Sequence, residues 1–162
     1  MNYFLSILSL IIVSACKESV IVQNLPDNAL IKPGDYKLTG ATSYTIEGVT
    51  SSEPVSGTLT VFTGPEGQYY FLERIAGRSP IGFQVQVNNL NLLLQSVQDY
   101  TKVGNTAYYG WMDKGCTGKL ESESIVYDRY ANTEGIGLTT PTGEQIRYTK
   151  KIRKHVHVVA AR

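Results

Sequence analysis

The sequence predicts an all-β protein, an antiparallel meander of about eight or nine strands that closes into a small barrel or sandwich. After Gly34, hydrophobic and polar residues alternate with period two, the repeat of a half-buried strand. Short clusters of Gly, Asn, Asp and Pro separate these segments at hairpin-length intervals. We expect closure because it removes the exposed strand edges that an open sheet would leave.

The composition bounds the size of the protein and its partners. The chain has 162 residues, the length of one domain. Hydrophobic residues make up 42% of it and charged residues 18%, which is a globular composition and excludes a disordered chain. The formal net charge is +1, so no overall positive field points to a nucleic acid, and we expect none as a partner.

The first fifteen residues form a separate segment. Residues 3–15 carry no charge; they are too few for a membrane-spanning helix, which needs about 20 residues, but fit the hydrophobic region of a signal peptide. They lead into the sequence VSAC at residues 13–16, which resembles the lipobox of bacterial lipoproteins. Two other interpretations stay open: a buried core segment with Cys16 as an ordinary thiol, and an uncleaved anchor.

The lipobox resemblance implies a lipid anchor at Cys16. Residues 1–15 would be removed as a signal peptide, the thiol would take a diacylglycerol, and the new amino group would take a further acyl chain such as palmitate. Such chains hold a protein to a bilayer, at about 0.8 kcal/mol per buried methylene. Lys17 after the cysteine is compatible with outer-membrane sorting. We therefore expect a lipid-anchored envelope protein with a tether over residues 16–33.

Lipidation of Cys16 would leave Cys116 without a partner in the chain. We expect Cys116 to be a half-buried, inert thiol, with a reactive or intermolecular thiol as the alternative.

The domain proper is predicted over residues 34–154, followed by a solvated basic tail over residues 155–162. Strands are predicted over residues 36–48, 56–63, 68–74, 83–87, 90–94, 107–112, 121–130, 136–140 and 145–154. Residues 96–103 could hold one helical turn at most.

The clearest hairpin is predicted around Asn88 and Asn89, because Asn tolerates the positive φ of a type I′ turn. With those two residues as the turn, residue 87 faces 90, residue 85 faces 92 and residue 83 faces 94. All six are hydrophobic, so the pattern and the turn agree on this register. Leu93 is the exception on the outer face.

The segments GDYKL at residues 34–38, ESIVY at 123–127 and GEQIRYT at 143–149 resemble lipocalin-like lipoproteins of bacterial envelopes. The lipocalin Gly-x-Trp signature would fall on Gly34 and Tyr36, with Tyr in place of Trp. The basic residue that packs across that aromatic ring would be Arg147 or Arg153. The resemblance implies a small meander barrel.

Large aromatic residues occur on both faces of successive predicted strands. We expect one set to fill the barrel and the other to form cross-strand pairs, while a cavity lined by the inner set or an outer recognition patch is the functional alternative. An eight-stranded barrel is just wide enough to be filled or to hold one small ligand. The candidate ligand-binding residues are Tyr36, Tyr69, Phe71, Phe83, Val85, Leu92 and Trp111.

Residues suited to catalysis or metal binding are sparse. The chain's two histidines, His155 and His157, would share one strand face but have no Cys or carboxylate beside them in the tail. Glu121 and Glu123 would also share a face, and the solvated side of a sheet is the simpler interpretation. We therefore predict no enzyme, no metal site and no cofactor.

The sequence thus favours a non-catalytic, membrane-anchored envelope lipoprotein whose barrel binds a small apolar ligand or an envelope protein. Its membrane partner would be the lipid bilayer, through acylated Cys16. The alternative is an inhibitory or structural lipoprotein that acts on a protein through a surface loop, for which residues 76–80 and 49–56 are candidates.

Overall fold

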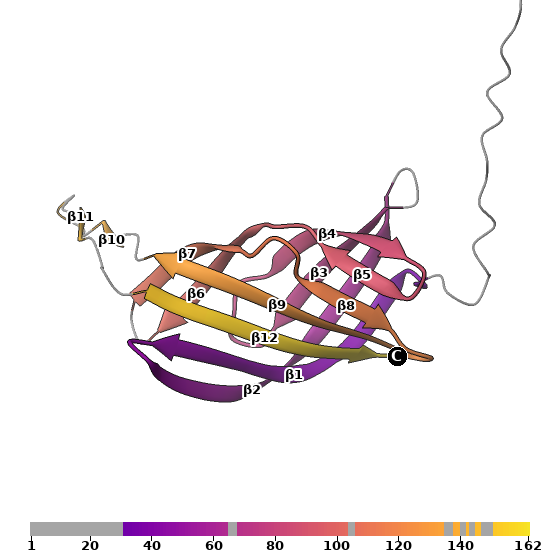
Figure 1. Ribbon diagram of the computed structural model, residues 1–162, viewed down its shortest axis with the longest axis horizontal. Helices are drawn as coiled ribbons and strands as arrows, with labels where there is room; N and C mark the ends of the chain where they lie inside the picture. Colours follow the sequence, from indigo (N-terminus) through magenta and orange to yellow (C-terminus); the bar gives the residue numbers. More distant parts are fainter. Residues whose placement is uncertain are drawn as a thin grey trace, which may run out of the picture.

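The computed structural model describes residues 31–64, 68–103, 106–134, 138–139, 142, 145–146 and 151–162. Its main sheet has ten antiparallel strands (Figure 1). They are β1 (Gly34–Ile46), β2 (Val49–Thr63), β3 (Tyr69–Ile75), β4 (Ile81–Asn88), β5 (Asn91–Leu94), β6 (Gln98–Val103), β7 (Thr106–Met112), β8 (Thr117–Leu120), β9 (Ser124–Glu134) and β12 (Lys151–Ala161). A separate hairpin joins β10 (Leu138–Thr139) to β11 (Gln145–Ile146).

Eight strands close into a barrel in the order β12-β1-β2-β3-β4-β5-β8-β9, because β9 pairs back with β12. The all-β meander barrel predicted from the sequence is confirmed. In the ranges given above, no helix is long and apolar enough to cross a membrane.

The barrel wall is continuous at one end and split at the other. β9 pairs with β8 along its first half and with β7 further on. Among the described strands, β6 pairs only with β7, and β2 pairs with β3 only from Gly57 onwards. The outer edge of β6 and the first half of β2 therefore border an opening, at the end of the barrel opposite the C-terminus (Figure 1).

The predicted basic tail over residues 155–162 is wrong, because nearly all of it belongs to β12. This strand pairs with β1 from Ile152 to Ala161 and with β9 along its whole length. Val156, Val158 and Ala160 are fully buried. Small hydrophobic residues alternate there with histidines and Val159, and this period-two pattern makes β12 the strand that closes the barrel. The predicted tether also ends earlier, since Ile31 packs into the core.

The β4–β5 hairpin has the predicted faces but not the predicted register. Val85 pairs with Leu94, and Val87 pairs with Leu92. The turn is therefore one residue further along, at Asn89 and Leu90, and Asn89 has the positive φ of 55°. This change moves each partner by two residues, so the inner face is preserved. Leu90, expected opposite Val87, lies exposed in the turn.

Other boundaries also differ from those predicted. Residues 49–56, proposed as a loop, form the first half of β2, after a tight turn in which Glu47 and Gly48 have φ of 52° and 83°. Residues 98–103 form strand β6, and β8 had not been predicted. Residues 121–123 form the turn before β9, so Glu121 and Glu123 are exposed turn residues and not a strand-face pair. Much of the predicted strand over residues 136–140 lies outside the described residues, as do residues 147–150.

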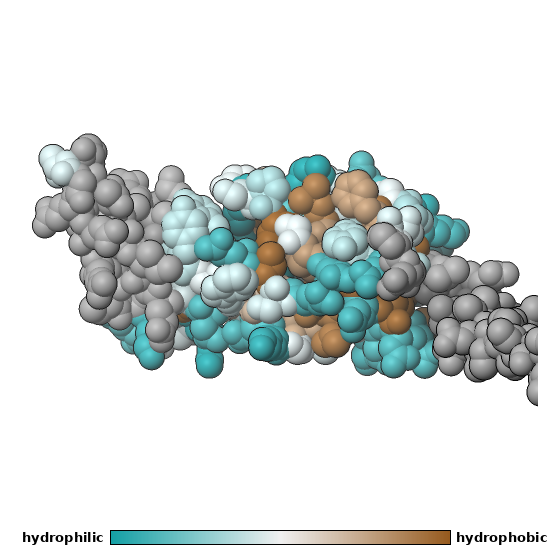
Figure 2. Space-filling model, turned by 90° about the horizontal axis from the view of Figure 1, so that it is seen from above, coloured by the Kyte–Doolittle hydropathy of each residue, from teal (hydrophilic) through white to brown (hydrophobic). Residues whose placement is uncertain are grey.

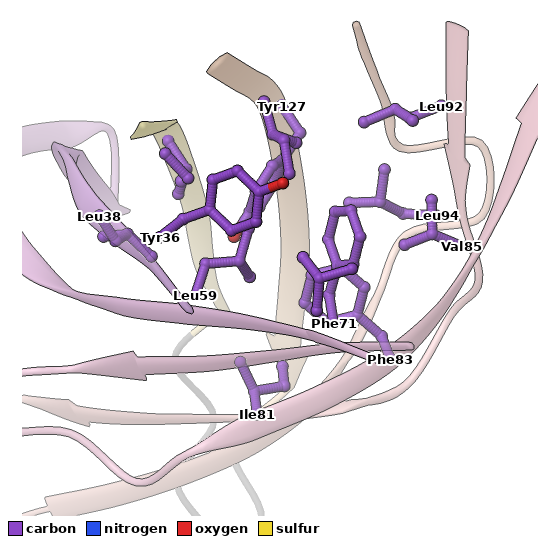
Figure 3. Packing of buried hydrophobic residues seen from close by; sticks show 14 of the residues in the cluster. Tyr36, Leu38, Leu59, Phe71, Ile81, Phe83, Val85, Leu92, Leu94 and Tyr127 are labelled. Atoms are coloured by element: carbon purple, nitrogen blue, oxygen red, sulfur yellow. The ribbon is translucent and has the colours of Figure 1, made fainter. Parts of the chain in front are cut away.

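The core occupies the continuous end of the barrel (Figure 3). Phe71, Phe83 and Tyr127 form its centre, with ring centroids 5.9–6.1 Å apart in tilted or edge-on arrangements. Aliphatic side chains surround them, among them Leu38, Leu59, Val85, Leu92 and Leu94. Side chains therefore fill this end of the barrel.

Candidate binding site at the split end of the barrel

The inner face of the same strands turns polar toward the split end. Seven polar or charged residues there are nearly inaccessible to solvent: Thr42, Glu73, Asp99, Thr101, Arg129, Thr133 and Lys154. They come from β1, β3, β6, β9 and β12, and each occupies an inward position of its strand. Closure of the barrel brings them together.

Four of these residues form a buried ion network. Arg129 donates from Nη1 to Oδ2 of Asp99 at 2.7 Å, and from Nε to Oε2 of Glu73 at 3.1 Å, while its Nη2 contacts the other oxygen of Glu73. Lys154 donates from Nζ to Oδ1 of Asp99 at 2.9 Å. The Tyr127 hydroxyl donates to Glu73 at 2.8 Å and links the network to the aromatic core. Two carboxylates thus balance two cations.

The network shifts the acid–base properties of its members. Burial alone would raise the pKa of the Asp99 carboxyl, but the charges of Arg129 and Lys154 outweigh burial and lower that pKa. Burial, aided by the charge of Arg129, lowers the pKa of Lys154 to about 8, against the opposing effect of Asp99. For Arg129, burial opposes the carboxylates of Glu73 and Asp99, and the carboxylates raise its pKa.

The network also caps the outer edge of β6. The Tyr100 carbonyl accepts a hydrogen bond from Nζ of Lys154 at 3.2 Å. A main-chain carbonyl in the middle of this strand is therefore satisfied by a side chain. A capped edge is a poor template for a further strand.

A pocket of about 610 Å³ opens at the split end, and the network reaches its wall where Lys154 donates to the Tyr100 carbonyl. It is lined by Tyr44, Glu53, Ala76, Gly77, Arg78, Ser79, Tyr100 and Thr101. The β3–β4 loop supplies Arg78, which turns inward, donates to Thr42 at 2.8 Å and to Glu53 at 2.6 Å, and lies over the Tyr44 ring. The mouth thus combines a fixed guanidinium, a carboxylate and the aromatic ring of Tyr44.

Thr101 is the one lining residue with an unsatisfied buried group. Its side chain is on the inward face of β6, and the residue is 2% exposed. Among the described side chains that are not exposed, its Oγ1 is the buried polar atom without a hydrogen-bond partner. A buried hydroxyl without a partner costs about 1–3 kcal/mol, so such groups usually have a partner in the functional state.

The predicted ligand-binding residues lie mainly at the other end. Tyr36, Tyr69, Phe71, Phe83, Val85 and Leu92 are buried in the core cluster. Trp111 is not among them, because its position in β7 faces outward and it is 63% exposed. Phe71 and Phe83 also line an apolar groove of about 260 Å³, together with Phe62, Leu72 and Val97. On the face in Figure 2, hydrophobic residues gather in the middle of the described body, with hydrophilic residues around them.

The residue that packs across Tyr36 is Arg162 and not Arg147 or Arg153. The Arg162 guanidinium lies 4.9 Å from the Tyr36 ring centroid and donates to the Pro33 carbonyl at 2.7 Å. Arg153 is exposed in the first half of β12, at the opposite end of the strand, and Arg147 lies outside the described residues. The chain's last residue therefore closes the apolar end of the barrel.

The two histidines lie on the outer face of β12 and share one carboxylate. His155 Nε2 and His157 Nδ1 lie 2.7 and 3.0 Å from Oδ1 of Asp128. The described residues contain no group of three or more His, Cys, Asp or Glu that could hold a metal ion. Cys116 is buried, and its burial raises the thiol pKa.

No family model, curated protein or solved structure matches the chain.

Proposed function

We propose that the chain is a non-catalytic, lipid-anchored envelope protein whose barrel binds a small ligand in the pocket at the split end. The observation that carries the proposal is the unpaired, buried hydroxyl of Thr101, a residue that lines a pocket of about 610 Å³. Ligand sites usually measure roughly 300–1,000 Å³ and present a few polar groups that fix orientation. A ligand that hydrogen-bonds Thr101 would remove the cost of the buried hydroxyl.

The anchor and the lipocalin-like assignment form the second part of the proposal. The closed eight-stranded barrel is consistent with a lipocalin-like fold, and the guanidinium packed on Tyr36 supports that likeness. The lipid anchor rests on the lipobox-like sequence at residues 13–16, which lies outside the described residues. In this proposal, acylated Cys16 anchors the barrel to the outer membrane of the cell envelope.

A small apolar ligand is the second candidate, because the groove beside Phe71 and Phe83 has hydrophobic walls. Its volume of about 260 Å³ is below the usual range for a ligand site, whereas the pocket at the split end falls within that range. We therefore prefer the split-end pocket.

Action through a protruding loop has less support. Residues 76–80 do form the β3–β4 loop, but Arg78 in that loop folds inward and pairs with Glu53 and Thr42. Its side chain is only 17% exposed, so the loop forms a wall of the pocket.

The binding proposal is tested by NMR titration of residues 17–162 with a panel of laurate, glycine, inorganic phosphate, methyl glucoside and maltose. We expect at least one compound to shift the amide signals of residues 76–79 and 100–101. Thr101→Val, which keeps the side-chain shape, should weaken that binding about tenfold, since one hydrogen bond contributes roughly 0.5–1.5 kcal/mol. Thr117→Val, at an exposed position in β8, is the matched control and should bind normally. A panel without any effect on these amides overturns the proposal.

The anchor is tested by mass spectrometry of the protein from its native host. We expect a chain that begins at Cys16 and carries three acyl chains, and Cys16→Ser should release the protein from the membrane fraction. An intact Met1 or an unmodified Cys16 thiol would refute lipidation without affecting the pocket.

A further inference from the structure

We infer that the pocket at the split end takes a neutral saccharide. This inference rests on the binding function proposed above and specifies its ligand. The charge balance of the pocket, the groups that line it and the engaged carbonyl on β6 support it.

The charges at the pocket and in the network beside it are balanced. Arg78 and Glu53 line the pocket and pair with each other. In the network next to its wall, the cations Arg129 and Lys154 are offset by the carboxylates Glu73 and Asp99. The cations and carboxylates contact each other directly, so neither sign is left in excess. An anion or a cation would gain little from such a site, because it would have to separate existing pairs.

The groups that line the pocket match the groups of a sugar. Tyr44 gives an aromatic ring, and the face that Arg78 does not cover suits the C–H surface of a pyranose ring. Arg78 and the hydroxyls of Ser79 and Thr101 can donate, and Glu53 uses Oε1 for its described contacts, which leaves Oε2 as an acceptor. A sugar presents both its C–H faces and hydroxyls that donate and accept. A fatty chain would leave the Thr101 hydroxyl unpaired.

An extended peptide is the occupant that an open strand edge would otherwise favour. Strand addition uses main-chain hydrogen bonds, but the carbonyl of Tyr100 is already engaged by Lys154. The pocket therefore presents side chains to a ligand, and not a strand edge with unpaired main-chain groups. A mono- or disaccharide is of a size that such a pocket can enclose.

The test is an isothermal calorimetry and NMR titration of residues 17–162 with neutral probes and with charged or apolar ones. The neutral probes are methyl glucoside, methyl galactoside, N-acetylglucosamine and maltose. The others are galacturonate, glucosamine, inorganic phosphate, laurate and a hexapeptide of alternating Val and Thr. We expect at least one neutral probe to bind, with amide shifts confined to residues 76–79, 100–101 and their neighbours.

Matched variants identify the groups that bind. Tyr44→Leu should weaken the sugar about tenfold while Tyr44→Phe keeps most of the affinity, because the ring face makes the contact. Thr101→Val should weaken it by a similar factor. Tyr70→Leu, on the outer face of β3 away from the pocket, should leave the affinity unchanged.

The outcomes separate this inference from the function on which it rests. If galacturonate, glucosamine, phosphate, laurate or the peptide shifts the pocket amides and no neutral sugar does, the saccharide inference is overturned and the binding function stands. If no probe shifts them, both are overturned. If sugar binding survives Tyr44→Leu and Thr101→Val in folded protein, the sugar binds elsewhere and the inference is likewise overturned.

Discussion

The two ends of the barrel are built from the same strands but have opposite interiors. At the continuous end, Phe71, Phe83 and Tyr127 fill the space with rings and aliphatic neighbours (Figure 3). At the split end, inward positions of β3, β9 and β12 carry Glu73, Arg129 and Lys154. β12 passes from one interior to the other, with Val158 and Val156 in the core and Lys154 in the network. One sheet can therefore hold a core and a polar site side by side.

The hydrophobic end of the barrel is the main source of stability, whereas the polar end is better suited to function. Burial of hydrophobic area stabilises a fold by about 25 cal/mol per Å². Buried ion pairs offset much of their attraction by desolvation, and replacing them with hydrophobic residues is often neutral or stabilising. A network such as that of Glu73, Asp99, Arg129 and Lys154 is therefore weak as a source of stability. Its position behind a pocket supports a role in shaping that pocket.

The largest expected effect is that of breaking the network at its centre. Arg129→Ala leaves the carboxylates of Glu73 and Asp99 buried without their main partner, and should lower the free energy of unfolding by about 5 kcal/mol. Urea denaturation followed by circular dichroism measures this change.

The matched control replaces the whole network by hydrophobic residues of similar size, as Glu73→Leu, Asp99→Leu, Arg129→Met and Lys154→Met together. We expect this variant to be about as stable as the wild-type protein, because no charge is left buried alone. It should lose ligand binding. A quadruple variant as unstable as Arg129→Ala would show that the network itself stabilises the fold.

The next effect belongs to the continuous end. Phe71→Ala removes a ring that contacts both Phe83 and Tyr127, and should cost about 4 kcal/mol through lost burial and the cavity left behind. Phe62→Ala, at a half-exposed position in β2, is the control and should cost less than about 1 kcal/mol. Equal losses in the two variants would contradict the assignment of the core.

The sequence predicted the continuous end better than the split end, for a physical reason. Strand parity depends on neighbours in the chain, so Phe83, Val85 and Leu92 could be assigned to the inner face even though the hairpin register was wrong. A shift of two residues keeps every side chain on its face.

The polar network could not be predicted in the same way, because its members come from four strands that only the closed barrel brings together. The sequence nevertheless places charged residues on the strand face that also carries the buried hydrophobic residues. Lys154 shares the parity of Ile152 and Val156, and Arg129 that of Tyr127. Charges in the inward series of hydrophobic strands indicate buried ion pairs. The outward Trp111 was misassigned because aromatic residues occupy both parities of β7.

A pH titration separates the two ends without a change in the core. Burial raises the pKa of Asp99, but the neighbouring charges of Arg129 and Lys154 lower it. The net effect is a lower pKa than in the unfolded chain. The unfolded state therefore takes up a proton first as the pH falls, so this stabilisation is present above about pH 4, the unfolded pKa, and is lost below it. Unfolding free energies between pH 7 and pH 2 should fall more steeply for the wild-type protein than for Asp99→Asn. Parallel curves would contradict this assignment.

A smaller effect is expected at the closure of the apolar end. Arg162→Ala removes the guanidinium from the Tyr36 ring and from the carbonyls of Lys32 and Pro33. We expect a loss of about 1 kcal/mol, the usual contribution of an exposed cation–π contact with its hydrogen bonds. Lys37→Ala, at an exposed position in β1, should leave the thermal midpoint unchanged. Arg162→Lys should restore only part of the loss, because an ammonium ion cannot reproduce the planar guanidinium.

The smallest effect contrasts the hairpin turns of the two ends. At the continuous end, the positive φ of 55° falls on Asn89, a residue that tolerates it. At the split end, Glu47 has a φ of 52° before Gly48, although Asn is the preferred residue at that position of such a turn. Glu47→Asn should therefore raise the free energy of unfolding by about 0.5 kcal/mol, and Asn89→Ala should lower it by about 1 kcal/mol. Differential scanning calorimetry of the two variants checks both signs. A loss of stability in Glu47→Asn would mean that contacts of the Glu47 side chain outweigh the strain in its backbone.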